Sequence, residues 1–369
     1  MEIVIIGGGL AGAATGYQLS RLGARRITII EREPTCGFHS SGRNAAMIRQ
    51  ITPLPQVTAL ASASVRFFSS PPADWQTQLA FRQTGSLLLA SGDGIAKLER
   101  EAAYARDCGI PVEFWSPERA VAHVPPLGGA VFESAVWSPT DGVLDVHALL
   151  EGYLRGVRAV GGRVATALTV IGFATEGSRI TAVRTTEGEL RADVVVNAAG
   201  AWAGETGHLA GAASVPLRPC RRHLLAAGPL ADVNPDWPFV WDVSHEFYFR
   251  PESGGLLFSP CDEEEYRPCD PPADPAAQLL LAEKLARFAP RLTEYPIRRT
   301  WAGLRTLAPD GRFVIGWDGK ITNFLWVAGL GGHGVTTSPA CSEIAARLVV
   351  GQEVASALPF APARFIKSD

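Results

Sequence analysis

The first 33 residues constrain the fold of this chain more than any other stretch. Ile3 to Ile6 is a short run of β-branched apolar residues, which is typical of a parallel strand buried on both faces. A helix is expected from about Leu10 to Leu22, where Gly23 ends it, and a second strand from Ile27 to Ile30. Together these elements predict a βαβ unit at the start of the chain.

Three glycines in this unit predict a dinucleotide site. Gly7, Gly9 and Gly12 follow the first strand in G-x-G-x-x-G spacing. Gly7 suits the tight turn, Gly9 the close approach of a pyrophosphate, and Gly12 the close packing of helix on strand. The helix N-terminus would then face the phosphates, and Glu31, which ends the second strand, would bind ribose hydroxyls.

The composition limits the classes of protein to which the chain can belong. A length of 369 residues exceeds what one hydrophobic core usually supports, so two interleaved domains are expected. With 47% hydrophobic residues and a net charge of −3, we expect a globular protein without a nucleic-acid or anionic-membrane partner. The six cysteines include no C-x-x-C pair, which indicates reduced thiols, and no metal site is expected.

The sequence also predicts where the protein acts. No apolar run is long enough for a transmembrane helix, and the first strand begins too early to leave room for a signal peptide. We therefore expect a cytoplasmic enzyme, either a monomer or a small homo-oligomer.

Later segments of the chain predict a return to the nucleotide site. Two further apolar strands, at 193–197 and 324–328, run into glycine turns at 197–200 and 329–334. In an open α/β sheet such turns collect at the carboxyl ends of the strands, where the ligand binds. A chain that returns twice to its nucleotide domain suits one long cofactor, which favours FAD over NAD. Other expected elements are helices at 56–68, 95–108, 145–160, 275–289 and 336–350, a meander at 163–192 and an antiparallel sheet at 216–260.

An acid run, Asp262 to Glu265, allows two interpretations. Four consecutive carboxylates are typical of a solvated loop. Alternatively, the run forms a lid over a cationic substrate. The residues alone leave both interpretations open.

Five segments together resemble the FAD-dependent amine and amino-acid oxidoreductases of the D-amino-acid oxidase type. They are the N-terminal fingerprint, His-Ser-Ser-Gly-Arg-Asn-Ala-Ala (39–46), Val-Val-Asn-Ala-Ala-Gly-Ala-Trp (195–202), Trp-Ala-Gly-Leu-Arg-Thr (301–306) with Pro-Asp-Gly (309–311), and Gly-Leu-Gly-Gly-His-Gly (329–334). The resemblance covers essentially the whole chain. Its pattern is most similar to D-arginine and other D-amino-acid dehydrogenases, with glycine and sarcosine oxidases as relatives.

The resemblance implies an α/β fold of the glutathione-reductase-like FAD type, α+β overall. A discontinuous, Rossmann-like FAD-binding domain would comprise 1–50, 140–215 and 306–369. A substrate-binding domain built on a mixed or antiparallel sheet would comprise 51–139 and 216–305. The residues implied at the cofactor are Gly7, Gly9, Leu10, Ala11, Gly12, Glu31, Arg32, Ser40, Ser41, Arg43, Asn44, Ala45, Ala46, Val170, Ala199, Gly200, Trp202, Gly303, Arg305, Gly331, Gly332, His333, Gly334, Val335 and Thr336.

The resemblance also implies a catalytic pocket made of Arg305, Tyr248 and His333. Arg305 matches the arginine that binds the substrate carboxylate, and Tyr248 matches the tyrosine that assists it. A bidentate Arg–carboxylate pair would orient the substrate Cα–H for hydride transfer to flavin N5, and no general base is required. The other substrate-binding candidates are Arg221 or Arg222, Arg49 and Met47.

Departures from the relatives narrow this implied chemistry. Gly303 stands where sarcosine oxidase has the cysteine that binds its flavin, so non-covalent FAD is expected. Thr336 stands where that enzyme has a carboxylate-binding lysine, which leaves this role to Arg305. The segment 82–86 offers no carboxylate to a guanidinium substrate. Neutral or apolar D-amino acids, or a cyclic imino acid, are therefore favoured over basic ones.

The resulting hypothesis is a FAD-dependent D-amino-acid dehydrogenase or oxidase that forms an imino acid, which water hydrolyses to a 2-oxo acid and ammonia. The electron acceptor is left open between O2 and a quinone or dye. One alternative is a secondary-amine oxidase of the sarcosine, glycine or proline type. Another is a subunit that carries flavin within a larger dehydrogenase.

Overall fold

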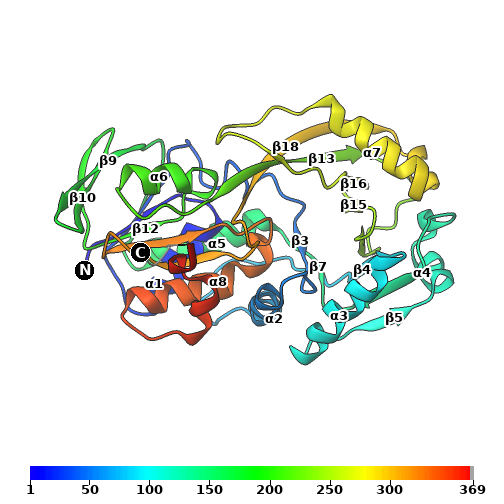
Figure 1. Cartoon of the computed structure of the whole chain (residues 1–369), viewed down its shortest axis with the longest axis horizontal. Helices are drawn as coiled ribbons and strands as arrows, with labels where there is room; N and C mark the ends of the chain where they lie inside the picture. The colour runs from blue at the N-terminus through cyan, green and yellow to red at the C-terminus, as the bar shows by residue number, and fades with distance from the viewer. Residues whose placement is uncertain (366–369) are drawn as a thin grey trace.

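The computed structural model describes residues 1–365, which form two sheet-based regions side by side (Figure 1). One region holds a six-stranded sheet with helices packed on it, and the other holds a nine-stranded sheet. This arrangement confirms the α/β class expected from the sequence. Within residues 1–365, no helix is both long enough and apolar enough to cross a membrane.

The six-stranded sheet is built around the N-terminal strand. Every neighbouring pair in it is parallel except the pair at the edge formed by its two latest strands in the chain, 314–317 and 324–328, which is antiparallel. The strand order is β19 (Val314–Trp317), β20 (Phe324–Ala328), β12 (Val194–Asn197), β1 (Ile3–Ile6), β2 (Ile27–Ile30) and β8 (Arg163–Ala165).

The two faces of this sheet bury alternate residues of β1. Ile3 and Ile5 pack into a core made with helices, whereas Val4 and Ile6 pack on the other side against a small meander. The helices are α1 (Leu10–Arg21), α2 (Pro55–Ser69), α5 (Val146–Ala159) and α8 (Gly334–Val349). The other side holds β9 (Val170–Glu176), β10 (Arg179–Thr185), β11 (Gly188–Arg191) and α6 (Ala203–Leu209).

The turn between β1 and α1 needs its glycines. Gly7 has φ +108°, a conformation that other residues rarely adopt. A Cβ atom on Gly12 would lie only 2.0 Å from the carbonyl oxygen of Gly7. The first turn of α1 therefore rests directly on the end of β1, which brings the helix N-terminus to the edge of the sheet.

The nine-stranded sheet forms the second region. Its pairs are antiparallel except the strands at 86–90 and 239–242, which are parallel, so the antiparallel sheet expected at 216–260 is extended by three strands from earlier in the chain. The order is β17 (Glu264–Glu265), β13 (Arg218–Ala227), β16 (Gly255–Ser259), β15 (Phe247–Glu252), β14 (Phe239–Asp242), β4 (Ser86–Ala90), β6 (Ser134–Ser138) and β5 (Glu113–Trp115), with β18 (Ile297–Leu307) paired to β13. Helices α3 (Asp93–Asp107), α4 (Pro117–His123) and α7 (Pro275–Phe288) belong to this region.

Two long paired strands, β13 and β18, run from the second region toward the first (Figure 1). Near the end of β18, the carbonyl of Thr306 accepts a hydrogen bond from the backbone N–H of Gly331 at 3.0 Å. Gly331 lies in the glycine turn after β20. The end of β18, with Arg305, is thereby held beside the carboxyl edge of the six-stranded sheet.

Helix α2 bears on the expected domain boundaries. It lies within 51–139, the range expected for the substrate domain, yet it packs against α8 in the core of the first region. A two-stranded sheet pairs β3 (Met47–Ile48) with β7 (Gly142–Val143), which lie in 1–50 and 140–215, both within the range expected for the FAD-binding domain. The division near residue 50 therefore stays a prediction.

Candidate active site

A single cavity of about 1170 Å³ joins the two regions. Small-molecule pockets are typically about 300–1,000 Å³, so this cavity has room for a long ligand together with a small one. It is lined by the first turn of α1, the loop 37–47, the turns after β12 and β20, and the inner face of the nine-stranded sheet.

At one end, the cavity presents the features of a pyrophosphate site. Ser41 Oγ accepts a hydrogen bond from the backbone N–H of Leu10 at 2.9 Å, so the loop 40–44 lies against the N-terminus of α1. A Cβ atom on Gly9 would lie 2.9 Å from this hydroxyl, which explains why a side chain is not accommodated there. Backbone amides at a helix N-terminus favour a bound phosphate.

Glu31 lines the cavity at the end of β2, as the fingerprint predicts. Its two carboxylate oxygens accept hydrogen bonds from the backbone N–H groups of Gly8 and Glu33, each at 2.9 Å. These contacts fix the carboxylate. Because a carboxylate has about four acceptor sites, it retains capacity for ribose hydroxyls.

An aromatic and cationic stack borders the nucleotide end of the cavity. The guanidinium carbon of Arg32 lies 3.6 Å from the ring centroid of Trp202, and the ring of His39 lies 4.5 Å from it. His39 Nε2 is 2.8 Å from a carboxylate oxygen of Glu33, and this hydrogen bond lowers the pKa of Glu33. The stack fixes the loop that follows β2 beside the cavity.

At the opposite end, Arg305 projects from β18 into the cavity. Within residues 1–365, its guanidinium makes no hydrogen bond or ion pair. Burial lowers the pKa of Arg305, and the positive charge of Arg222 lowers it further. A Cβ atom on Gly332 would lie 2.7 Å from Arg305 Nε, so the glycine turn leaves just enough space for this side chain.

Tyr248 and Trp241 form an aromatic wall next to Arg305. Their ring centroids are 4.7 Å apart, and both residues line the cavity from β15 and β14. Burial raises the pKa of Tyr248, so its hydroxyl stays protonated at neutral pH and can donate a hydrogen bond. The guanidinium carbon of Arg49 lies 4.3 Å from the Trp241 ring centroid, and its Nε donates to the carbonyl of Ile51 at 2.8 Å.

His333 lies in the glycine turn before α8 and stays neutral. Burial, followed by the charges of Arg49 and Arg305, lowers the pKa of His333 to about 3. Thr336, one helical turn later, accepts a hydrogen bond from the N–H of Arg49 at 3.1 Å and donates to the carbonyl of Met47 at 3.3 Å. These bonds join the start of α8 to β3, so the two segments line the cavity together.

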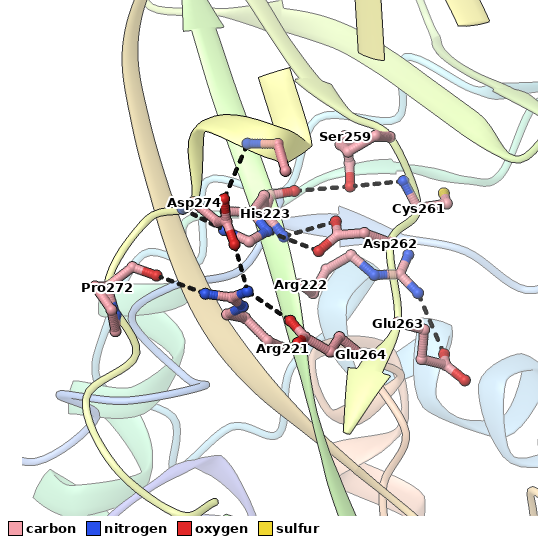
Figure 2. Close-up of polar contacts among 12 residues, drawn as sticks. Arg221, Arg222, His223, Ser259, Cys261, Asp262, Glu263, Glu264, Pro272 and Asp274 are labelled. Atoms are coloured by element: carbon pink, nitrogen blue, oxygen red, sulfur yellow. Dashed lines mark hydrogen bonds and ion pairs between the residues drawn. The ribbon is translucent and has the colours of Figure 1, made fainter. Parts of the chain in front are cut away.

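The two arginines at 221 and 222 point to opposite sides of β13 (Figure 2). Arg222 lines the cavity, where its Nη2 is 3.3 Å from Glu263 Oε2. Arg221 lies outside the cavity, where it pairs with Glu264 and with Asp274, the latter at 2.8 Å. Alternation of side chains along a strand separates these neighbours.

The remaining predicted residues lie as follows. Every residue that the sequence places at the cofactor or substrate lines the cavity except Arg221 and Gly12, which lies in the first turn of α1 and packs against the carbonyl of Gly7. Sequence reasoning missed Leu224 and Trp241, which line the cavity beside Tyr248, and it considered Glu263 only as part of the acid run. The signal for Glu263 is the order of charges: Arg-Arg-His at 221–223 and Asp-Glu-Glu at 262–264 pair in antiparallel order.

Comparison with known proteins agrees with this geometry. The sequence pattern of the DAO family, described as FAD dependent oxidoreductase, matches residues 2–348. The chain belongs to this family. It is therefore a FAD-dependent oxidoreductase, and the pyrophosphate end of the cavity, with Gly9, Ser41 and Glu31, fits the nucleotide half of FAD.

Several relatives cover nearly the whole chain. FAD-dependent oxidoreductase domain-containing protein 1 of Bos taurus is 29% identical over 400 residues, which cover 95% of this chain and 81% of that protein. The crystal structure of L-proline dehydrogenase from P. horikoshii has a TM-score of 0.90 and 27% identity, covering 99% of this chain and 97% of that one. Glycine oxidase from Geobacillus kaustophilus shares the fold, with a TM-score of 0.85, 23% identity and 99% coverage of both chains.

Proposed function

We propose that the protein oxidises the CH–NH bond of an amino acid whose carboxylate binds Arg305. The observation that carries this proposal is the free guanidinium of Arg305, which lines the same cavity as the FAD cradle. A half-buried guanidinium without a protein acceptor is available to a ligand, and a substrate carboxylate would bind it with two parallel hydrogen bonds. The protonated hydroxyl of Tyr248 would add a third donor.

The charges around the cavity would also prepare the substrate amine. Arg305 would place positive charge near the amine, which favours its neutral form and thus lowers its pKa. His333 is neutral, so it would act as a hydrogen-bonding wall rather than as an added positive charge. Oxidation removes a hydride from Cα and a proton from nitrogen and leaves an imine, which water hydrolyses to a 2-oxo acid and ammonia. When bound, FAD supplies the two-electron acceptor for this oxidation.

For the substrate, we favour a neutral or apolar D-amino acid. The aromatic wall of Trp241 and Tyr248 and the apolar side chain of Leu224 suit such a side chain. A secondary amine, such as a cyclic imino acid, is supported by the 27% identity to an L-proline dehydrogenase over almost the whole chain. Both candidates use the same carboxylate contact, and they differ in what the nitrogen carries.

Anaerobic reduction of the bound flavin tests this proposal. The purified holoenzyme is mixed without oxygen with D- and L-forms of alanine, leucine and proline, and with glycine and sarcosine, and flavin absorbance is recorded. We expect at least one of these amino acids to bleach the flavin and to yield a 2-oxo acid or its cyclic imine. If none bleaches it while dithionite does, the catalytic proposal fails and a flavin-carrying subunit becomes the better account.

A further inference from the structure

Three consecutive residues of β13 pair with three consecutive acids of the acid run (Figure 2). Arg221 pairs with Glu264, Arg222 with Glu263, and His223 with Asp262. The backbone register Arg221↔Glu264 continues this order along the two strands. Three of the four acids are therefore ion-paired to β13, although Glu263, Glu264 and Glu265 are exposed, and of these acids Glu263 lines the cavity.

The two outer pairs anchor the segment 260–274 to β13. His223 Nδ1 lies 2.6 Å from Asp262 Oδ2, and its Nε2 accepts a hydrogen bond from the backbone N–H of Asp274 at 2.9 Å. Arg221 also binds Asp274, at 2.8 Å. Both ends of the segment are thus held on the side of β13 that faces away from the cavity, and this fixes the position of Glu263 between them.

The inner pair, Arg222 and Glu263, faces the cavity near Arg305. Arg222 is 8% exposed, and its contact to Glu263, at 3.3 Å, uses only Nη2. Its Nε and Nη1 are buried and have no acceptor within residues 1–365. Arg222 is close enough to Arg305 to lower the pKa of that group, which burial already lowers.

The formal charges of the residues at this end of the cavity determine which ligand charge the site can neutralise. Arg305 and Arg222 are opposed by one carboxylate, Glu263, which leaves one net positive charge. The charge of Arg49 is opposed instead by Glu101 and Asp141, neither of which lines the cavity. One substrate carboxylate therefore neutralises the site. A second would compete with Glu263 for Arg222, and a cationic side chain would compete with Arg222 for Glu263.

We propose that Glu263 is a specificity-determining residue, which neutralises Arg222 and so restricts the site to substrates with one carboxylate and an uncharged remainder. This inference rests on the proposed function, because it concerns the ligand that Arg305 binds. It predicts that removing the charge of Glu263 exposes Arg222 to a second carboxylate. The variant should then accept dicarboxylic ligands that the native protein rejects.

Two pairs of ligands that differ by one negative charge test this inference on the holoenzyme. Butanoate and succinate are titrated by calorimetry, and glutamine and glutamate, in both configurations, are compared in anaerobic flavin reduction. In the native protein we expect butanoate to bind about tenfold more tightly than succinate, or better. In Glu263→Gln the ratio of butanoate affinity to succinate affinity should fall by about tenfold or more. The rate of flavin reduction by glutamate should likewise rise relative to the rate with glutamine.

Two neighbouring acids provide matched controls. Glu265→Gln removes an exposed carboxylate that makes no ion pair within residues 1–365, and should leave the ratio unchanged. Glu264→Gln loosens the same segment from its outer side through Arg221, and should lower the affinity for both ligands without changing their ratio.

The outcomes separate this inference from the proposed function. The inference is overturned if Glu263→Gln keeps the native butanoate-to-succinate ratio within about twofold, or if Glu264→Gln shifts the ratio equally. It is also overturned if neither carboxylate binds the native holoenzyme. By contrast, carboxylates that bind with the expected ratio while no amino acid bleaches the flavin would support the charge selection by Glu263 and contradict the proposed oxidation.

Discussion

Replacing Arg305 by methionine should separate binding of the substrate from stability of the fold. Arg305 is half-buried at the wall of the cavity, lies near a second guanidinium and has no acceptor within residues 1–365. In the substrate-free protein it therefore contributes desolvation cost and repulsion rather than an ion pair. We expect Arg305→Met to keep or raise the melting temperature, because methionine fills a similar volume without a charge.

The same substitution should strongly reduce kcat/KM for the amino-acid substrate. Losing one partner of a buried, hydrogen-bonded charge pair costs about 2–5 kcal/mol. At about 1.4 kcal/mol per factor of ten, kcat/KM for an amino acid should fall about 30-fold to about 5,000-fold. Steady-state kinetics with the amino acid that best reduces the flavin, together with thermal unfolding of the same samples, measure both effects.

Two control variants sharpen this comparison. Arg298→Met removes an exposed arginine from the same strand, outside the cavity, and should leave kcat/KM unchanged. Arg305→Lys keeps the charge but loses the planar guanidinium that binds a carboxylate with two hydrogen bonds. Its kcat/KM should therefore lie between the values for the native enzyme and for Arg305→Met. The reasoning is refuted if Arg305→Met keeps the native KM, or if its loss of activity simply follows a loss of stability.

Three further predictions concern the cofactor, the pH dependence and the anchored segment. Ser41→Ala removes the acceptor for the Leu10 N–H and should weaken FAD binding by about 2-fold to about 30-fold, measured by release of FAD on dilution; an unchanged affinity would remove Ser41 from the cradle. The pKa of His333 is lowered to about 3 in the native protein, so between about pH 3 and about pH 6.5 this imidazole binds a proton in the unfolded chain but not in the native protein. The free energy of unfolding therefore falls as pH falls through that window. His333→Asn should flatten this dependence by up to about 1.4 kcal/mol per pH unit in denaturant titrations, and an unchanged slope would contradict the buried neutral imidazole. Asp262→Asn should weaken the contact to His223 and speed limited proteolysis within 260–274, whereas equal cleavage rates in the native protein and the variant would show that this contact does not hold the segment.

Most residues that the sequence predicts for the nucleotide half of the site line the cavity. The functions of Gly7, Gly9 and Glu31 follow from local geometry, since a tight turn, a helix N-terminus and a strand end all lie within one short stretch. The structure places these residues where that geometry requires. Local rules suffice here because the residues involved are close in sequence.

The substrate half was harder to predict because it depends on register between distant strands. Arg221 and Arg222 could not be distinguished until the pairing of β13 with β17 and β18 was known. The same register assigns Glu263 to the cavity and Glu264 to the opposite side. Trp241 was missed for a related reason, since its strand pairs with β4, about 150 residues earlier in the chain.

The central claim is that this cavity oxidises an amine held by its carboxylate. Anaerobic mixing of the holoenzyme with matched pairs, proline against pyrrolidine and D-alanine against ethylamine, tests it most directly, because each pair differs only in the carboxylate. The account predicts that the carboxylate-bearing member of at least one pair bleaches the flavin, and that its partner does so at least about 30-fold more slowly. Equal rates for the two members of a reactive pair, or no bleaching by any of the four compounds or by other amino acids, would contradict it.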